Sequence, residues 1–266
     1  METNLIMETP LIWDVDPVMF SIGLLSPRWY GLMFALSFWL GYHIGARTFA
    51  DAKIPLKYAD SLFMYLMAGT ILGARLGHVI FYDLDYYLMN PHLILAFWEG
   101  GLASHGAVVG VTASVWLFAR NNKAVPFLWA ADRIVIPFTL GGFFVRFGNF
   151  FNSEILGKPA DVPWAVVFAR VDELPRHPSM LYEAFWYLGV FAFFVWVYKR
   201  YATKPPAGSL SALFLILVFI GRFLIEFTKE NQSAFEAALP INMGQILSLV
   251  CIAIGTVWAL RISWKR

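Results

Sequence analysis

The sequence has few charged residues and a single cysteine. Of its 266 residues, 14% are charged, and the formal net charge is +2. A net charge this small does not indicate a nucleic-acid-binding protein. Because Cys251 has no second cysteine to pair with, a disulfide within the chain is impossible, and a reaction that needs another thiol must take it from a substrate. The composition therefore argues against nucleic-acid partners and against a disulfide-stabilised domain.

The motifs of metal sites and soluble hydrolases are also missing. The chain has no HxxxH or HExxH spacing, no GxSxG turn and no glycine-rich phosphate loop. Its histidines are spread along the sequence: His43, His78, His92, His105 and His177. The amino-terminal stretch METNLIMETPLIWDVD lacks the basic region and short apolar core of a signal peptide, so we expect a retained tail. We expect neither a metal ion nor a cofactor.

Long apolar runs dominate the chain, which is 59% hydrophobic and has a mean hydropathy of +0.62. A helix needs ~20 apolar residues to span a bilayer. Runs of about this length occupy residues 29–49, 59–82, 101–118, 125–151, 179–198, 209–228 and 241–260. A shorter run, residues 91–101, is typical of a re-entrant or interfacial piece. We predict an all-α, polytopic membrane protein with about seven transmembrane helices, forming a single integral membrane domain over residues 1–266. A small periplasmic insertion on the outer face is predicted at residues 152–177.

Basic residues in the loops predict the orientation in the membrane. If the first helix starts outside, more basic loop residues lie inside than outside, as the positive-inside rule requires. The inner set is Arg47, Lys53, Lys57, Arg120, Lys123, Lys199, Arg200, Lys204, Arg261, Lys265 and Arg266, and the outer set is Arg28, Lys158, Arg170, Arg176 and Lys229. The amino terminus is therefore predicted to lie outside and the carboxyl terminus inside.

Four arginines interrupt the apolar runs, although a central arginine costs about 2.5 to 3.5 kcal/mol on insertion scales. Arg133 lies beside Asp132, and a local ion pair or a snorkelling side chain is sufficient to explain it. The other three, Arg75, Arg146 and Arg222, fall in the outer thirds of their predicted helices. These three therefore need a different explanation.

His105 and Tyr30 are predicted at the same depth as these three arginines. Each side chain could reach the outer headgroups independently, but the positive-inside bias disfavours outer arginines. We therefore favour one shared cationic site. Guanidinium groups bind phosphate bidentately, and the phosphates of the outer leaflet are lipid headgroups. A phospholipid-processing enzyme is thus the first hypothesis.

Two other classes fit less well. A transporter or channel needs polar groups along the full membrane depth, but the inner half offers little beyond Asp132 and Arg133. An intramembrane protease needs a serine with a histidine, or paired aspartates, within its helices, and no such set is evident. Spacing instead supports the cationic site, because Arg146 with Asn149 and Arg222 with Glu226 each share one helix face.

The stretch RFGNFFNSEILG, residues 146–157, resembles the motif G-R-x-G-N-F-x-N-x-E-x-x-G of bacterial prolipoprotein diacylglyceryl transferases. Further similarities to this family follow in chain order: DPVMFSIG, WYGLM, GARLGHVIFY, WEGGLASHG, RHPSMLYEA, GRFLIEF and MGQILS. Two positions depart from the family pattern. Val145 replaces the first glycine of the motif, and Val218 stands where some members carry a tyrosine.

The resemblance implies a seven-helix enzyme of the bacterial inner membrane with its active site toward the periplasm. Such an enzyme transfers the sn-1,2-diacylglyceryl group of phosphatidylglycerol to the thiol of the lipobox cysteine in a preprolipoprotein. The products are a thioether-linked precursor and glycerol 1-phosphate, in the first step of lipoprotein maturation. The expected partners are phosphatidylglycerol, lipobox segments and membrane lipids, with no nucleic acid, and we expect a monomer.

The resemblance also implies roles for residues of this chain. The essential histidine and arginines of the family match His105, Arg146 and Arg222, which are the catalytic candidates. His105 could be the general base or an organiser of the thiol. The substrate-binding candidates are Arg146, Tyr30, Asn149, Glu154, Gly157, Glu226, Arg75, Gly100 and Gly101. For Gly100 and Gly101, helix packing is the alternative explanation.

Overall fold

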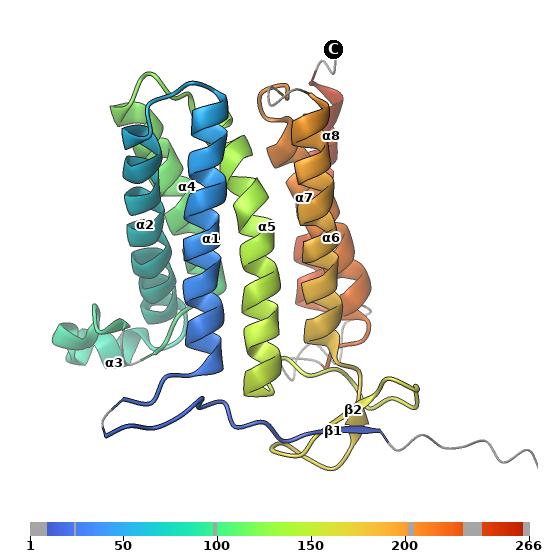
Figure 1. Cartoon of the computed structure of the whole chain (residues 1–266). Helices are drawn as coiled ribbons and strands as arrows, with labels where there is room; N and C mark the ends of the chain where they lie inside the picture. Colours follow the sequence, from blue (N-terminus) through green and yellow to red (C-terminus); the bar gives the residue numbers. More distant parts are fainter. Residues whose placement is uncertain (1–9, 24, 98–99, 202–204, 231–240, 263–266) are drawn as a thin grey trace, which may run out of the picture. The chain divides into compact units, whose positions relative to one another are not determined.

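The computed structural model describes residues 10–23, 25–97, 100–201, 205–230 and 241–262. Within these residues the chain is mainly helical, with one small sheet (Figure 1). The helices are α1 (Trp29–Asp51), α2 (Lys57–Phe81), α3 (Leu84–Met89), the 3-10 helix η1 (Pro91–Leu93), α4 (Ser104–Asn121), α5 (Phe127–Asn152), α6 (Ser179–Arg200), α7 (Ser209–Glu226) and α8 (Met243–Leu260). The strands are β1 (Leu11–Trp13), β2 (Val166–Phe168) and β3 (Pro175–Arg176).

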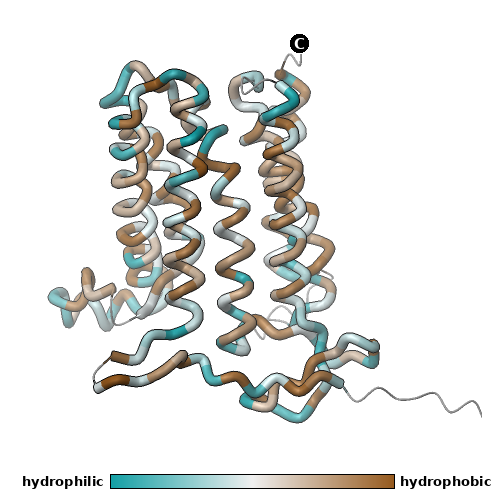
Figure 2. Tube along the Cα trace, in the orientation of Figure 1, coloured by the Kyte–Doolittle hydropathy of each residue, from teal (hydrophilic) through white to brown (hydrophobic). Residues whose placement is uncertain are grey.

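Each predicted apolar run forms one of the long helices. Five of these helices are long and apolar enough to cross a membrane: α2, α5, α6, α7 and α8. In Figure 2, hydrophobic residues recur along the length of these helices. The chain is therefore a polytopic membrane protein, as predicted, whereas the total of about seven spans stays a prediction because α1 and α4 are not among these five helices. The shorter run begins with η1 and continues in turns.

The chain divides into two compact units whose boundaries fall within α1 and α5. One unit is Tyr42–Ile134, and the other combines Met1–Gly41 with Val135–Arg266. Some residues named in the predictions lie outside the described residues. They are Lys204, Lys265 and Arg266 of the inner basic set, residues 1–9 of the expected tail, and the WE pair of the motif WEGGLASHG.

In the unit Tyr42–Ile134, glycines let α2 and α4 pack backbone against backbone. A Cβ atom added to Gly110 would lie 2.0 Å from the carbonyl oxygen of Gly69, and one added to Gly106 would lie 2.2 Å from that of Gly73. Small residues permit this close approach between membrane helices. The Ser114 hydroxyl strengthens the contact by donating a hydrogen bond to the Tyr65 carbonyl across 2.8 Å.

In the other unit, small residues make room for aromatic side chains between helices. Gly142 of α5 lies against the ring of Tyr187 on α6, and Gly221 of α7 lies against the indole of Trp186. The Trp186 Nε1 donates to the carbonyl of Leu217 across 2.9 Å. These contacts hold α5, α6 and α7 at distances that let polar side chains near their ends meet.

A three-stranded sheet adjoins the end of α5. Strand β1 pairs in parallel with β2, and β2 pairs antiparallel with β3. Both β2 and β3 lie in the predicted insertion 152–177, whereas β1 comes from the amino-terminal tail. The all-α assignment predicted none of these three strands. The Trp13 Nε1 ties β1 to α5 by donating to the Phe150 carbonyl across 3.1 Å. The extramembrane location of this region stays a prediction.

Arg176 fastens the insertion through ion pairs. Its guanidinium donates to the Asp172 carboxylate and, across 2.5 Å, to Glu230 Oε1. The hydrogen bonds from Arg176 hold the pKa of Asp172 below its usual value and, in return, raise the pKa of Arg176. The contribution of Asp172 to stability is therefore present above the ordinary aspartate pKa and declines as the pH falls toward the lowered value.

The glycine contact between α2 and α4 predicts that an added methyl group destabilises the protein at the contact but not at a glycine with open space around it. Gly110→Ala should lower the free energy of unfolding by about 1 to 3 kcal/mol, because the new methyl group would meet backbone atoms that cannot rotate away. Gly45→Ala is the control, since nothing lies within 4 Å of its added Cβ. Thermal unfolding in detergent should show a lower midpoint for Gly110→Ala alone. Equal midpoints for the two variants would contradict this account of the packing.

Candidate functional site

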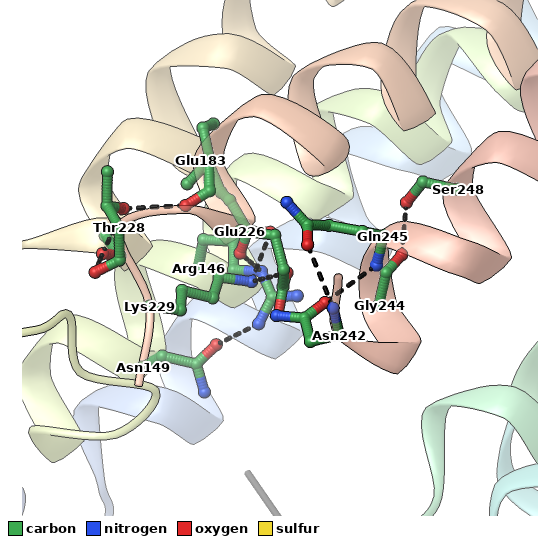
Figure 3. A network of polar contacts seen from close by, with 12 residues as sticks. Arg146, Asn149, Glu183, Glu226, Thr228, Lys229, Asn242, Gly244, Gln245 and Ser248 are labelled. Carbon is green, nitrogen blue, oxygen red and sulfur yellow. Dashed lines mark hydrogen bonds and ion pairs between the residues drawn. The ribbon is translucent and has the colours of Figure 1, made fainter. Parts of the chain in front are cut away.

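Arg146 lies near the end of α5, where its guanidinium is held on two sides (Figure 3). Its Nε forms an ion pair with Glu183 Oε2 of α6 across 2.7 Å. Its Nη1 donates to Asn149 Oδ1 across 3.2 Å, which is consistent with the prediction that these two residues share one helix face. The Arg146 side chain keeps 15% of its surface exposed, whereas that of Glu183 keeps 1%. Arg146 is thus the partly accessible member of a buried pair.

Lys229 joins Glu183 to a second buried carboxylate. Its Nζ donates to Glu183 Oε1 across 2.9 Å and to Glu226 Oε2 across 3.0 Å. Glu226, at the end of α7, keeps 5% of its side-chain surface exposed and Lys229 keeps 2%. Two cations and two carboxylates therefore alternate through the network, which satisfies the requirement that buried charges be paired.

The beginning of α8 completes this network. Asn242 and Gln245 form a capping box, in which the Asn242 side chain accepts from the Gln245 N–H and the Gln245 side chain accepts from the Asn242 N–H. The Asn242 Nδ2 also donates to Glu226 Oε1 across 3.4 Å. A Cβ added to Gly244 would lie 2.9 Å from the Glu226 carboxyl carbon. Glu226 thus lies against a helix amino terminus, whose partial positive charge favours a carboxylate.

A second chain of hydrogen bonds orients Asn149 from the turn after α5. Its Nδ2 donates to Glu154 Oε2 across 2.9 Å, and the Asn152 Nδ2 donates to Glu154 Oε1 across 3.1 Å. Ser153 and Ile155, which flank Glu154, have φ angles of 55° and 58°. A positive φ is costly for a β-branched residue. The strained turn therefore fixes the carboxylate that orients Asn149.

Arg222 has a different environment from the one its spacing predicted. Glu226, four residues later, binds Lys229 and Asn242 rather than Arg222. Among the described residues, Arg222 makes no hydrogen bond and no ion pair, yet it lies close enough to interact electrostatically with Glu183. It therefore adds one positive charge beside a network whose four charges cancel.

Tyrosines also line this cluster. Tyr30 at the start of α1 interacts electrostatically with Arg146 and Glu154, and its ring fills the space beside Gly148. The Tyr187 hydroxyl of α6 forms a hydrogen bond with Arg146. The structure thus brings together Arg146, Asn149, Glu154, Glu226, Tyr30 and Arg222 in one unit.

Gly157 has contacts that favour a structural role. Its N–H donates to the His177 carbonyl across 3.1 Å, and its carbonyl accepts from Arg176 Nη1 across 3.1 Å. A Cβ at this position would lie 2.3 Å from the His177 carbonyl oxygen. The absence of a side chain therefore lets two segments meet, and the substrate-binding assignment of Gly157 stays a prediction.

Arg75 lies in the unit Tyr42–Ile134, where its guanidinium organises the segment before α4. The side chain is 2% exposed and stacks on Tyr87, with 4.9 Å between the guanidinium carbon and the ring centroid. It donates to the carbonyl oxygens of Leu93, Ile94, Gly100 and Gly101 at distances of 2.7 to 3.3 Å. These bonds use the Nε and both Nη atoms, so the geometry favours a positioning role over contact with lipid.

Gly100 and Gly101 adopt the left-handed backbone conformation, with φ angles of 94° and 64°. Glycine accommodates this conformation without steric cost, and it turns both carbonyls toward Arg75. His105 follows in the first turn of α4, where its exposed ring contacts Phe81 with 4.9 Å between centroids. Its ring nitrogens make no hydrogen bond with any residue that the structure describes. His105 belongs to the unit Tyr42–Ile134, whereas Arg146 and Arg222 belong to the other.

Sequence patterns alone did not indicate Glu183 or Lys229 as members of the site. Glu183 lies in RHPSMLYEA, but its position in the first turns of α6 resembles that of an ordinary interfacial carboxylate. Lys229 was counted as an outer loop residue, although it is buried. A charged residue just beyond an apolar run, close to Glu226, was the only signal. Among the described residues, no group of three or more histidine, cysteine, aspartate or glutamate side chains could hold a metal ion.

Together, these features define a polytopic membrane protein with a buried ionic cluster where the ends of α5 and α7 meet the beginnings of α6 and α8. Comparison with known proteins identifies its family. Residues 17–261 match the sequence profile of the prolipoprotein diacylglyceryl transferases. The chain belongs to this family, which confirms the resemblance found in its motifs.

Similar proteins from three bacteria share the name phosphatidylglycerol–prolipoprotein diacylglyceryl transferase. The protein of Tolumonas auensis is 45% identical over 250 residues, which cover 94% of this chain and 96% of that protein. The protein of Chloroherpeton thalassium is 44% identical over 247 residues, covering 93% and 92%. The protein of Porphyromonas gingivalis is 41% identical over 265 residues, covering 94% and 93%. The similarity therefore extends over nearly the full length of each chain.

The contacts of Arg75 predict that a lysine cannot replace it. Arg75→Lys keeps the charge but cannot donate to four carbonyl oxygens, and a lost hydrogen bond to a charged group costs about 1.5 to 3 kcal/mol. We expect faster hydrogen–deuterium exchange in residues 93–103 and a lower unfolding midpoint. Arg47→Lys is the control, because the Arg47 side chain is 79% exposed. Unchanged exchange in Arg75→Lys would argue against the positioning role.

Proposed function

We propose that this chain transfers the sn-1,2-diacylglyceryl group of phosphatidylglycerol to the thiol of the lipobox cysteine of a preprolipoprotein. Its relatives are named for this activity. The observation that carries the proposal to this chain is the cationic cluster. Arg146 is held at the edge of a neutral ion-pair network, and Arg222, which makes no ion pair among the described residues, adds a second guanidinium beside it.

The cluster suits the headgroup of phosphatidylglycerol. Its phosphodiester carries one negative charge, and Arg222 offers a guanidinium that has no carboxylate partner among the described residues. Guanidinium groups bind phosphate oxygens with two parallel hydrogen bonds, and they do so most strongly where water is scarce. Arg146 and Arg222 are proposed to bind this phosphate, with Tyr30, Asn149, Glu154 and Glu226 shaping the site around it.

The reaction exchanges a carbon–oxygen bond for a carbon–sulfur bond. The cysteine sulfur attacks the carbon of the diacylated glycerol that carries the phosphate ester. The bonding pair of the broken C–O bond leaves with the phosphate oxygen. The products are the thioether and glycerol 1-phosphate, whose phosphate gains negative charge as it departs. Arg146 and Arg222 would stabilise that charge, and such electrostatic stabilisation typically contributes most of an enzyme's rate enhancement.

The thiol must lose its proton for this attack. A free cysteine has a pKa of about 8.5, so only a few per cent is thiolate at neutral pH. His105 is the proposed base or organiser of the thiol, because its ring is exposed and its nitrogens have no partner among the described residues. Arg75, Gly100 and Gly101 would support it by fixing the turn that precedes α4.

The membrane is proposed to be the bacterial inner membrane, with the amino terminus outside and the carboxyl terminus inside. Burial of Arg176 and Lys229 in ion pairs supports this orientation, since the exposed basic residues assigned to the outer side are then reduced to Arg28, Lys158 and Arg170. The insertion 152–177 would lie on the periplasmic side. The enzyme is proposed to act as a monomer on lipobox segments and membrane lipids.

Purified protein in detergent or vesicles tests the function directly. Phosphatidylglycerol and a peptide with a lipobox cysteine should together yield glycerol 1-phosphate and a peptide heavier by one diacylglyceryl group. Release should require the cysteine, so a peptide with serine in its place is the control. Release of glycerol phosphate without the peptide would indicate a phospholipase. No release of glycerol phosphate under any condition would contradict the proposal.

Removal of either arginine should slow transfer strongly. Arg146→Ala and Arg222→Ala are expected to lower kcat by about 10²- to 10³-fold, the range found when one electrostatic stabiliser is removed from an active site. Arg170→Ala is the control, because its side chain is 43% exposed and lies 3.8 Å from its nearest carboxylate. Near-normal rates in both alanine variants would disprove the role of the cluster in charge stabilisation.

A pH–rate profile separates the two roles of His105. If His105 is the base, the rate of the parent declines where a histidine becomes protonated, and His105→Gln loses that acidic limb as well as most of its rate. If His105 only orients the thiol, His105→Gln lowers the rate at every pH by a similar factor. A profile with an unchanged shape would rule out His105 as the base.

A further inference from the structure

Lys229 has no role in the proposed reaction, yet it is one of the most deeply buried charges of the chain. It follows the end of α7 and keeps 2% of its side-chain surface exposed. Its ammonium group lies between the carboxylates of Glu183 and Glu226, at 2.9 and 3.0 Å (Figure 3). A lysine on a solvated loop would not need two buried counter-ions, so this placement requires a specific explanation.

Backbone contacts hold Lys229 in place independently of its side chain. Its N–H donates to the Glu226 carbonyl across 3.2 Å, and the residue forms an isolated bridge with Gly157. On the neighbouring segment, the Lys158 N–H donates to the Thr228 carbonyl across 2.8 Å. The ammonium group therefore projects from an anchored backbone, as expected for a group that sets the position of others.

Lys229 controls how Glu183 can bind Arg146. Glu183 gives one oxygen to Arg146 and the other to Lys229. Without the ammonium group, the second oxygen would be left without its charged partner. A carboxylate in that state can bind a guanidinium with both oxygens, which would draw Arg146 toward α6. Lys229 thus keeps Arg146 in a one-oxygen contact that leaves part of its guanidinium for a ligand.

Lys229 also sets the charge of the cluster. Arg146 and Lys229 balance Glu183 and Glu226, while the nearby Arg222 and Glu154 add one charge of each sign. Loss of the Lys229 charge would therefore make the cluster net negative and leave Glu226 as a buried carboxylate without a cation. Buried groups in this state are strongly unfavourable. The same change would misplace Arg146 and weaken the attraction of the cluster for a phosphate.

We propose that Lys229 is a positioning residue for the phosphate-binding guanidinium of Arg146, and that it acts through Glu183. The inference rests on the proposed function, since it assumes that Arg146 stabilises the departing phosphate. Lys229 itself touches neither the lipid nor the thiol. Its effect should therefore depend on the presence of the Glu183 charge, which a direct ligand of the phosphate would not require.

The test is a double-mutant cycle on the full-length protein, measured as kcat for glycerol 1-phosphate release from phosphatidylglycerol vesicles with a lipobox peptide. Lys229→Met and Glu183→Gln are each expected to lower kcat by about 10- to 100-fold, the range typical when the group that orients a ligand-binding side chain is removed. The double variant should be no slower than Glu183→Gln alone, because the two residues act in series. Lys229→Arg should recover most of the lost rate.

Lys158→Met is the matched control. Lys158 is exposed, and its Nζ donates to a backbone carbonyl, that of Phe227, across 3.1 Å. Its removal is expected to change kcat by no more than about twofold, as for an ordinary surface substitution. The unfolding midpoint of every variant is measured in the same detergent, so that kcat refers to folded protein.

Three results would overturn the inference. They are a parent-like kcat in Lys229→Met, a double variant in which the two single effects multiply, and a Lys229→Arg variant as slow as Lys229→Met. If Lys229→Met does not fold, the double variant decides, because it removes one charge of each sign. A kcat like that of Glu183→Gln supports the inference, and a parent-like kcat overturns it. No release by the parent and by Lys158→Met would instead overturn the proposed function, and this inference with it.

Discussion

The ionic cluster depends on one buried carboxylate that serves two cations. Glu183 keeps 1% of its side-chain surface exposed and binds Arg146 with one oxygen and Lys229 with the other. Desolvating a charge costs several kcal/mol, which only close and well-oriented partners can offset. Each member of this group therefore needs the others, and replacing one of them affects the position of all. This mutual dependence makes a flexible arginine into a fixed group at the end of α5.

Four helix ends are needed to build such a group, and the packing between the helices determines where those ends meet. Gly142 and Gly221 let aromatic residues of α6 fit against α5 and α7. The capping box at the start of α8 then brings Asn242 to Glu226. The Tyr187 hydroxyl reaches Arg146 from α6, which gives the cluster an aromatic hydroxyl even though Val218 lacks one. Interactions far from the polar groups thus decide their geometry.

Local patterns predicted the parts of this structure that depend on nearby residues. The apolar runs located the long helices, and the spacing of Arg146 and Asn149 placed both residues on the helix face where they form a hydrogen bond. The same reasoning failed for Glu226, because the spacing to Arg222 permits a contact but does not show which cation lies closer in space. Glu183 and Lys229 are separated by 46 residues in the sequence, and only the packing of α6 against α7 brings them together. The three strands were missed as well, and β1 for the same reason, since its partner β2 lies in a distant segment.

The balance of charges explains how one cluster can be both stable and reactive. A cluster in which every cation had its own carboxylate would be stable, but it would exert little attraction on an anion. A cluster of unpaired arginines would attract phosphate strongly, yet burial would be too costly to sustain. Here the paired charges fix Arg146, while Arg222 stands beside them with no ion pair among the described residues. A phosphodiester entering this site would give Arg222 the anionic partner that the described residues do not provide, so binding of the lipid would extend the network of ion pairs.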